Sequence, residues 1–506
     1  MLIKIYLVLL SIGFNLGNPI FFSTYHSLNI DTSCQIDSFS SDTVSHVKVL
    51  IPTFLGNEQR NYYGNEAPSR LDVIWKLYLG EGETVISRKT GAKKWKGAGW
   101  TGQPLLVRED SLLYLIQGAY DHNLKKINAA SGKIVWEYKF DDVVKGTGTI
   151  WVNKKADNLR DKYIILQGSR LGVENYLDSK HIPSYRAISY FNGEELWRLD
   201  SKWMDSYSRD VDGSALIIND TAYIGLENSL FTVFDPDYRN ARWTDSMLQP
   251  KIIQERKLYL KKDVLDHKYN VVTESSPSLL NDHIYIASGS GHVWGYNLKT
   301  KELDWDYYIG SDLDGSAIVT GDSCILVSVE KQYIKGKGGV LKLNPLNKPE
   351  DAAVWFFTVE NNDFVSWEGG VIGSVGINDR YVSKESVGLA AFSGIDGYLY
   401  VVDHESLIKD SLILGPDSLT TFSTPKLVYK HQIGPSISTP IFTKNRLIAA
   451  SYNGVFLFSY DQDLNFKLLD VWESSFEATP IVYNRVIYVA SRDGYLYCFG
   501  EMNKNP

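Results

Sequence analysis

The sequence predicts an all-β protein, an eight-bladed β-propeller built from four-stranded antiparallel blades. Short β-branched and aromatic segments recur with turn residues between them, at a spacing of roughly 40–60 residues that is typical of propeller repeats. Aromatic residues make up 13 % of the 506 residues and methionine occurs only 4 times, a composition that suits wide, packed sheets. A strand pattern near the N-terminus also lacks the partners that three strands near the C-terminus could supply.

The segment 275–305 shows one complete blade. Its inner strand begins at Ser276, its second strand is His283–Ser288, and its outer strand begins at Glu302. Ser290 and Gly291 make the hairpin between the second and third strands, because glycine supplies the positive φ that tight hairpin turns need. One such sheet cannot bury both of its faces, so several copies must stack against each other.

The two ends of the chain are expected to share a blade. Leu71–Leu79 matches an outer strand, whereas residues 476–499 carry three strands without a fourth. We expect the N-terminal strand to complete this last blade, since such closure removes the free edges of the ring. The other seven blades are expected at 100–140, 146–200, from 212 with an outer strand near 252–260, 275–305, 314–359, 368–432 and 436–472. Seven blades in total remain the alternative if the third is wrongly divided.

The N-terminus predicts an exported protein. One lysine precedes a short apolar run within Met1–Phe14, the pattern of a secretory signal peptide, which we place at residues 1–18. An uncleaved anchor is the alternative. Residues 19–70 are expected to form an extension that wraps a surface or is partly disordered. Residues 71–502 are expected to form the propeller, and the expected location is the periplasm or cell envelope.

The net charge and the cysteine content exclude some partners and structural classes. The net charge is −8 and no basic cluster occurs, so nucleic acid is excluded as an expected partner. No segment after the signal peptide is long and apolar enough to span a membrane. Three cysteines argue against a disulfide framework; Cys324 and Cys498 lie in strand patterns and are expected to be buried.

The propeller topology separates two faces. We call the working face the one that carries the links entering each inner strand and the hairpins between second and third strands. The residues just before the inner strands form a column that is predicted to circle the channel mouth on this face: Thr101, Thr147, Asp212, Glu274, Asp314, Glu368, Ile437 and Glu477.

Five members of this column are carboxylates. Like charges about 8 Å apart repel by roughly 2 kcal/mol at an effective dielectric constant near 20, so the ring is expected to take up protons or hold a cation. Ca²⁺ suits oxygen ligands, and Asp212 and Asp314 are its candidate ligands. A cationic small ligand or a basic peptide would also suit the ring. The alternative interpretation is that these carboxylates only cap turns.

Further candidates lie in hairpins and links of the same face. The hairpin residues Asp121, His122 and Asn123 depart from the usual Asp-Gly turn, and a non-glycine residue at positive φ often marks a functional site. Trp100 and Trp367 could wall a pocket or pack in the core. Longer hairpins at 171–185 and 331–338 are expected to rise above the working face.

Several outer-strand segments carry a family resemblance. Ala130–Trp136, Asn192–Trp197 and Lys299–Trp305 resemble the tryptophan-docking repeat of the quinoprotein-like (pyrroloquinoline-quinone repeat) propellers, and so do the hairpins at 393–400 and 491–497. The resemblance covers roughly residues 71–500. It implies the propeller fold, but not one activity, because that family includes quinone-dependent dehydrogenases and scaffolds that bind no cofactor.

Three functional hypotheses follow. The first is a non-catalytic propeller that binds a protein or a small ligand at the acidic channel mouth, with no cofactor or with Ca²⁺. The second, which the resemblance implies, is a pyrroloquinoline-quinone-dependent, calcium-containing dehydrogenase; the adjacent cysteine pair that many of the family's alcohol dehydrogenases carry is missing. The third is a hydrolase or lyase, for which no catalytic motif is found. The chain also resembles, in fold only, the propeller lipoproteins that assist outer-membrane barrel assembly, but it lacks their lipid-attachment cysteine.

Overall fold

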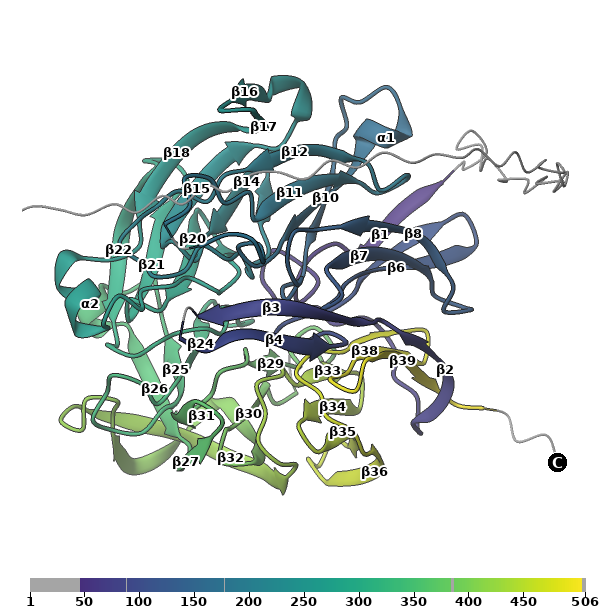
Figure 1. Cartoon of the computed structure of the whole chain (residues 1–506). Coiled ribbons are helices and arrows are strands. Elements are labelled where there is room, and N and C mark those ends of the chain that lie inside the picture. The colour runs from purple at the N-terminus through teal and green to yellow at the C-terminus, as the bar shows by residue number, and fades with distance from the viewer. Residues whose placement is uncertain (1–45, 88, 177, 384–385, 503–506) are drawn as a thin grey trace, which may run out of the picture. The chain divides into compact units, whose positions relative to one another are not determined.

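The computed structural model describes residues 46–502 except 88, 177, 384 and 385. Their strands form eight antiparallel propeller sheets that follow one another in chain order around a ring (Figure 1). The prediction of an eight-bladed propeller is therefore confirmed, and the seven-bladed alternative is wrong. The predicted signal peptide lies outside the described residues, and the predicted domain boundaries remain predictions.

Each of the first four blades pairs its strands in chain order from the channel outward. Their strands are β5 (Leu105–Glu109), β6 (Leu112–Gly118), β7 (Asn123–Asn128) and β8 (Ile134–Lys139); β9 (Thr149–Val152), β10 (Tyr163–Gly168), β11 (Tyr185–Ser189) and β12 (Glu195–Leu199); β13 (Leu216–Ile218), β14 (Thr221–Gly225), β15 (Leu230–Asp235) and β18 (Lys251–Lys257); β19 (Ser278–Leu280), β20 (His283–Ser288), β21 (His292–Asn297) and β22 (Glu302–Tyr308). The sequence left the division of the third blade open. Its outer strand, β18, lies close to the predicted range 252–260.

The last four blades follow the same order. Their strands are β23 (Ile318–Val319), β24 (Ile325–Val329), β25 (Gly339–Leu343) and β26 (Ala353–Thr358); β29 (Gly376–Ile377), β30 (Leu389–Ser393), β31 (Tyr398–Leu414) and β32 (Thr421–Gln432); β33 (Ile441–Thr443), β34 (Arg446–Ser451), β35 (Gly454–Tyr460) and β36 (Phe466–Trp472); β37 (Ile481–Tyr483), β38 (Val486–Ala490), β39 (Tyr495–Gly500) and β2 (Asp72–Tyr78). The eighth blade therefore joins the two ends of the propeller, as predicted, with Trp75 opposite Cys498 and Leu77 opposite Leu496.

Smaller elements decorate the loops. They are β1 (Val47–Ile51), the hairpins β3 (Glu81–Ser87) with β4 (Gly91–Lys96), β16 (Arg242–Thr244) with β17 (Met247–Gln249) and β27 (Asn361–Phe364) with β28 (Trp367–Gly369), the helices α1 (Leu159–Lys162) and α2 (Lys261–Asp266), and the 3₁₀ turns Tyr238–Asn240 and Pro349–Asp351. No helix among the described residues has the length and apolar character to cross a membrane. Cys324 and Cys498 are buried, as expected.

Tryptophans at the start of outer strands connect neighbouring blades. Trp136, Trp197 and Trp305 donate their indole N–H to the backbone oxygens of Tyr190 (3.0 Å), Pro236 (2.9 Å) and Asn347 (3.1 Å). In each blade the strand register shifts immediately before the tryptophan. Such a bulge turns the side chain out of its own sheet, so the indole reaches the next blade.

We expect Trp197→Phe to lower the free energy of unfolding by about 1–2 kcal/mol, because the phenyl ring keeps much of the apolar contact but leaves the buried Pro236 oxygen without its donor. Trp197 is 1 % exposed, whereas Trp203, the matched control, is 62 % exposed. Equilibrium urea denaturation measures the difference between the variants. An equal loss in Trp203→Phe would show that the hydrogen bond is not the cause.

Small hydroxyl residues at the starts of inner strands join the blades near the channel. The backbone N–H of Ser214 donates to Ser276 Oγ, that of Ser276 to Ser316 Oγ, and that of Ser316 to Ser374 Oγ, each at 2.9 Å. Thr439 and Thr479 continue the chain of bonds through blades seven and eight. The serine and threonine pattern of the sequence therefore satisfies backbone donors that the closely packed inner strands would otherwise bury unpaired.

The described part of the N-terminal extension lies in the central channel. β1 adds to the channel edge of β5, and residues 52–66, which we call the channel segment, then cross the ring. Ile150 N–H donates to Pro52 O, Val319 N–H to Gln59 O and Val482 N–H to Tyr63 O. These bonds reach inner strands of blades two, five and eight, on the side away from the working face. For these residues, the expectation of an extension that wraps a surface is wrong.

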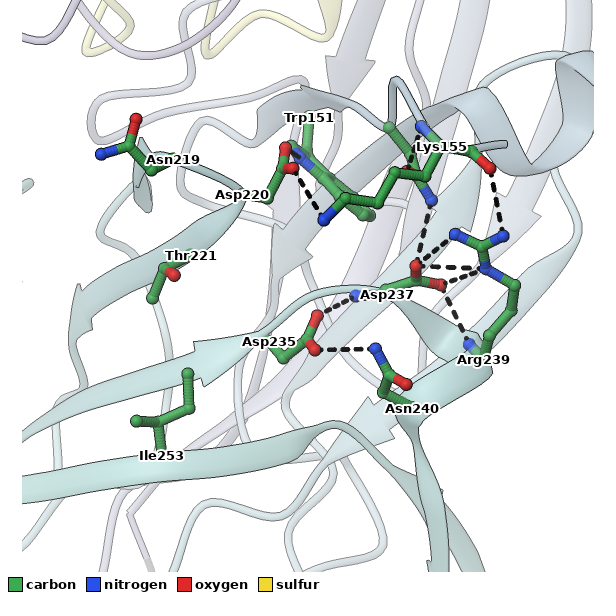
Figure 2. Close-up of a pocket in the computed structure, with 11 residues that line it drawn as sticks. Trp151, Lys155, Asn219, Asp220, Thr221, Asp235, Asp237, Arg239, Asn240 and Ile253 are labelled. Carbon is green, nitrogen blue, oxygen red and sulfur yellow. Dashed lines mark hydrogen bonds and ion pairs between the residues drawn. The ribbon is translucent and has the colours of Figure 1, made fainter. Parts of the chain in front are cut away.

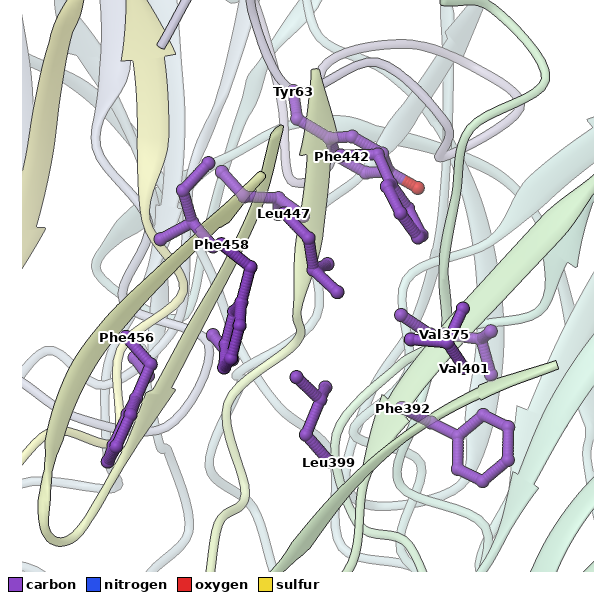
Figure 3. Close-up of a cluster of buried hydrophobic side chains, with 14 of the residues drawn as sticks. Tyr63, Val375, Phe392, Leu399, Val401, Phe442, Leu447, Phe456 and Phe458 are labelled. Carbon is purple, nitrogen blue, oxygen red and sulfur yellow. The ribbon is translucent and has the colours of Figure 1, made fainter. Parts of the chain in front are cut away.

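The largest hydrophobic cluster runs through blades five to eight and includes the channel segment (Figure 3). Phe54, Leu55 and Tyr63 are at most 1 % exposed. Figure 3 shows Tyr63 beside Phe442 of β33, and the Tyr63 hydroxyl accepts a hydrogen bond from the Ile377 N–H (2.9 Å). Burial of aromatic residues here stabilises both the ring and the segment inside it.

Candidate functional site

The loops of the working face enclose a cavity of about 1020 Å³, which we call the working-face cavity. An adjoining cavity of about 590 Å³ shares Trp95, Lys145 and Glu274 with it. Aromatic, acidic and basic side chains line the larger one: Trp95, Trp100, Tyr120, Tyr207, Trp367 and Tyr452; Glu274, Asp312, Asp314, Glu330 and Glu477; Lys93, Lys145 and Arg492.

The β3–β4 hairpin lies over the channel mouth between blades eight and one (Figure 1). Arg170 fixes its first strand by donating to Thr84 Oγ1 (2.7 Å) and Val85 O (3.1 Å), and it also pairs with Asp210 (2.7 Å). The Trp95 ring, from the second strand, packs 5.1 Å from the Tyr120 ring. The hairpin therefore forms one wall of both cavities.

The predicted hairpin of blade one positions this wall. The sequence predicted a non-glycine residue at positive φ in this turn, and His122 has φ 72°. Its Nε2 lies 2.8 Å from Glu83 O in β3. Asp121 accepts a hydrogen bond from Lys125 Nζ (2.6 Å), and the Asn123 side chain donates to Asp121 O (3.1 Å). These three residues hold the hairpin in place, and the neighbouring Tyr120 lines the cavity.

The structure brings together four of the five carboxylates in the predicted column. Asp212, Glu274, Asp314 and Glu477 all lie at the channel mouth. Glu368 is exposed in β28 and does not belong to the column, so this part of the alignment is wrong. Ser374 occupies the hydroxyl position of blade six, which puts Ile372 in the column. The inserted β27–β28 hairpin separates Glu368 from the inner strand and caused the error.

The carboxylates divide into two groups. The first triad, Asp212, Glu227 and Glu274, has ligand oxygens within 4.8 Å of one another. Lys145 pairs with Asp212; although burial opposes its charge, the surrounding carboxylates raise the pKa of Lys145 well above its usual range. Burial raises the pKa of Glu274 to about 7, with Lys145 acting against the shift and Asp212 adding to it. One cation therefore partly neutralises this triad.

The second triad, Asp312, Asp314 and Glu330, also has its oxygens within 4.8 Å of one another. Burial, reinforced by the neighbouring carboxylates, raises the pKa of all three well above the usual range. Two ionised groups at this distance repel by roughly 3 kcal/mol at an effective dielectric constant of 20. The predicted metal ligands Asp212 and Asp314 thus belong to different triads.

The wall of the cavity next to the β3–β4 hairpin is aromatic and carries Glu477, the fifth lining carboxylate. Glu477 accepts a hydrogen bond from the Tyr452 hydroxyl (2.8 Å) and pairs with Arg492 (3.2 Å). The Arg492 guanidinium lies 4.8 Å from the centroid of the Tyr120 ring. Trp100 and Trp367, which were predicted to wall a pocket or to pack, do both, because they line the cavity and join a small hydrophobic cluster beside it.

Several site residues were missed in the sequence. Lys145 is a single lysine in the link to blade two, and no pattern distinguishes it. Glu330 directly follows the second strand of blade five, and Glu227 lies two residues after the second strand of blade three. Aligning the residues after second strands, in addition to those before inner strands, would have found both.

A second, smaller pocket lies on the opposite face between blades two and three, with a volume of about 350 Å³ (Figure 2). Its charges are paired with each other: Lys155 with Asp220 at 3.2 Å, and Arg239 with Asp237 at 2.6 Å. Asn240 donates to Asp235 (2.8 Å). These contacts account for the polar groups at its edge, unlike those of the working-face cavity.

Pyrroloquinoline quinone fits the cavity poorly. The quinone carries three carboxylates and needs cationic partners. Of the lining cations, Lys145 is paired with Asp212 and Arg492 with Glu477, which leaves Lys93 at the exposed edge. The second triad and Glu274 offer no positive charge in either protonation state, so a trianion would lose its water without gaining cationic partners. Ca²⁺, by contrast, fits the oxygen-only chemistry of the second triad.

Comparison with known proteins establishes the family. Residues 81–344, more than half of the chain, match the family model of pyrroloquinoline-quinone repeats described as outer membrane protein assembly factor BamB. The chain belongs to this family. The predicted quinoprotein-like resemblance is thus confirmed. No curated protein matches the chain.

Solved structures share the fold of this BamB-type propeller at low identity. Quinohemoprotein alcohol dehydrogenase from Comamonas testosteroni superposes with a TM-score of 0.54 at 11 % identity, over 90 % of this chain and 81 % of that one. A europium-containing methanol dehydrogenase gives 0.53 at 12 %, over 89 % and 98 %. BamB from Moraxella catarrhalis gives 0.43 at 11 %, over 85 % and 100 %. The similarity to the two dehydrogenases shows the propeller fold and does not decide between catalysis and binding.

Proposed function

We propose that this chain is a non-catalytic, exported binding propeller whose working-face cavity receives a positively charged segment of a partner protein. The observation that carries the proposal is the charge of the cavity. Five carboxylates line it against three cationic side chains, and two of those cations are already in ion pairs with carboxylates. Burial raises the pKa of most of these carboxyls, and an arginine or lysine side chain of a partner would supply the positive charge that lets them ionise.

The aromatic lining supports the same ligand class. Trp95, Tyr120 and Tyr207 line the cavity on the side of Glu274, and aromatic faces attract cations, guanidinium groups in particular. Arg492 already lies 5.6 Å from the Trp95 ring centroid, so one arginine of this chain makes such a contact. An envelope location is supported by the apolar N-terminal run and by the family's description as an outer membrane assembly factor.

A fluorescently labelled arginine-rich peptide tests the proposal by anisotropy. We expect the peptide to bind. We expect the double variant Glu274→Gln with Glu477→Gln to weaken binding by at least tenfold, because it removes two carboxylates that line the cavity. Glu350→Gln is the matched control, since Glu350 is an exposed carboxylate. It removes the same type of charge outside the cavity and should leave the affinity unchanged.

Three results would contradict this function. The peptide could fail to bind, a glutamate-rich peptide could bind equally well, or Glu350→Gln could weaken binding as much as the cavity variant, which would indicate attraction by net charge alone. Reduction of a dye after addition of pyrroloquinoline quinone and an alcohol would favour the dehydrogenase instead.

A further inference from the structure

The second triad is buried in a way that its own side chains do not explain. Asp312 is 4 % exposed and Glu330 is 3 % exposed. Asp312 Oδ1 and Glu330 Oε1 are buried and have no hydrogen-bond partner among the described residues. The same holds for Asn270 Oδ1. A native protein rarely buries three acceptor oxygens at one place without a donor or a cation.

The first triad provides an internal comparison. It too has buried oxygens without a hydrogen-bond partner, on Asp212 and Glu227, but there the ammonium of Lys145 pairs with Asp212, so a positive charge of the chain itself partly compensates the cluster. The ion pairs of the described residues include none with Asp312, Asp314 or Glu330. The neighbouring Lys331 directs its ammonium to the backbone oxygen of Ile334 instead. The second triad is therefore the acidic cluster of the cavity whose positive partner is missing.

The geometry around the triad brings further oxygens to the same place. The Asn270 side chain donates to Asp312 Oδ2 (2.7 Å) and to Gln332 Oε1 (3.1 Å). This leaves Asn270 Oδ1 available as an acceptor. Asp312 and Asp314 come from the link before β23, and Glu330 directly follows β24, so blade five supplies all three carboxylates.

We infer that the second triad, together with Asn270 Oδ1, binds one Ca²⁺ ion. The donor set consists of oxygens only, which selects a hard cation over zinc or copper. Several protein carboxylates with an amide oxygen suit Ca²⁺, whereas Mg²⁺ is usually held by fewer carboxylates and keeps several water molecules. The site uses only this chain's own side chains and requires neither a quinone nor the basic partner proposed above.

Protonation is the competing account of the same cluster. Asp314 lies within hydrogen-bond reach of both Asp312 and Glu330, so shared carboxyl protons would relieve part of the repulsion, but they would leave Asn270 Oδ1 without a donor. A single divalent cation among these oxygens compensates all of them at once. Both accounts predict a role for the triad, and the response to the metal alone separates them.

Isothermal titration of the chelator-treated full chain with CaCl₂ tests the inference. We expect one Ca²⁺ per chain, a rise in melting temperature on its addition, and weaker binding of MgCl₂. Asp314→Asn and Glu330→Gln should each weaken Ca²⁺ binding at least 100-fold. Without metal, both variants should melt at or above the wild-type temperature, because they relieve repulsion, so loss of binding would not reflect loss of folding.

Two matched controls locate the site. Asp212→Asn changes the first triad, and Asp322→Asn changes a cluster formed by Asp322, His404 and Glu405; both should keep the wild-type affinity for Ca²⁺. The inference is overturned if Ca²⁺ does not bind at stoichiometric ratio or if Asp212→Asn abolishes binding while Asp314→Asn does not. The titration contains no peptide, so its failure would leave the proposed basic partner untouched.

Discussion

Replacing Arg60 by alanine is expected to lower the free energy of unfolding by about 4 kcal/mol. Arg60 belongs to the channel segment and is fully buried. Its guanidinium donates to the backbone oxygens of Pro277 (2.9 Å), Phe54 (2.9 Å) and Ser214 (3.2 Å), and also to Thr53 Oγ1 (2.7 Å). The truncation leaves these acceptors unpaired and opens a cavity at the centre of the ring.

Arg60 is a buried cation, so its contribution to stability depends on the acceptors around its guanidinium. Burial lowers the pKa of Arg60 to about 9, so the side chain remains charged at neutral pH. Its hydrogen bonds all go to uncharged oxygens, which must together replace the water that the ion has lost. Arg60→Lys keeps the charge but cannot donate in three directions from one planar group. We therefore expect it to lower the free energy of unfolding, by less than Arg60→Ala does.

Urea denaturation with Arg70→Ala as control measures this effect. Arg70 pairs with Asp72 at 3.0 Å, but its side chain is 42 % exposed, and an exposed pair contributes at most about 1 kcal/mol. Limited proteolysis gives a second measurement, because a released channel segment would become a substrate. Equal stabilities of Arg60→Ala and Arg70→Ala would show that the channel segment does not hold the ring together.

The fold was predictable because each blade repeats local signals. Trp136, Trp197 and Trp305 each follow a turn at the same place in a blade, and small hydroxyl residues open the inner strands. Both signals arise from contacts with the next blade, so they recur wherever a blade has a neighbour. Repetition allowed eight blades to be counted from weak individual patterns.

The channel segment could not be predicted for the opposite reason. It occurs once, and its residues satisfy partners on many inner strands that are far away in sequence, such as Val319 and Val482. Neither a period of two nor a helical period results from such contacts. The error at Glu368 has a related cause, since a hairpin that occurs in one blade shifts an alignment based on repetition.

The candidate site was predictable in outline and not in detail. The column gave Asp212, Glu274, Asp314 and Glu477 because the fold places equivalent loop positions around one mouth. The division into two triads depends on Lys145 and on the residues after second strands, Glu227 and Glu330. A charge that acts through a single spatial neighbour leaves no periodic signal in the sequence.

A strong pH dependence is expected from Glu274. Burial raises the pKa of this carboxyl to about 7, against roughly 4.3 in an unfolded chain, so the native state binds its proton more tightly. The stabilisation is complete below about pH 4.5 and is lost as pH rises through 7, because the unfolded state binds fewer protons in that window. The loss amounts to about 3 kcal/mol by pH 8.

The groups that face Glu274 determine the size of this effect. They come from the links before blades two, three and five and from the hairpins of blades two and three: Lys145, Arg170, Tyr207, Asp210, Asp212, Glu227, Asp312 and Asp314. The cations Lys145 and Arg170 oppose the shift, whereas burial and the carboxylates favour it. Because the other buried carboxylates also titrate, only the difference between wild type and a Glu274 variant isolates this residue.

Glu274→Gln should match wild type near pH 4.5 and exceed its stability by about 3 kcal/mol at pH 8, since glutamine resembles the protonated carboxyl in shape and cannot ionise. Urea denaturation of both chelator-treated proteins from pH 4.5 to 8 measures the divergence. Glu350→Gln, an exposed carboxylate, should follow wild type throughout. Parallel curves for Glu274→Gln and wild type would mean that the pKa of Glu274 is not raised by folding and that this carboxyl is ionised at neutral pH.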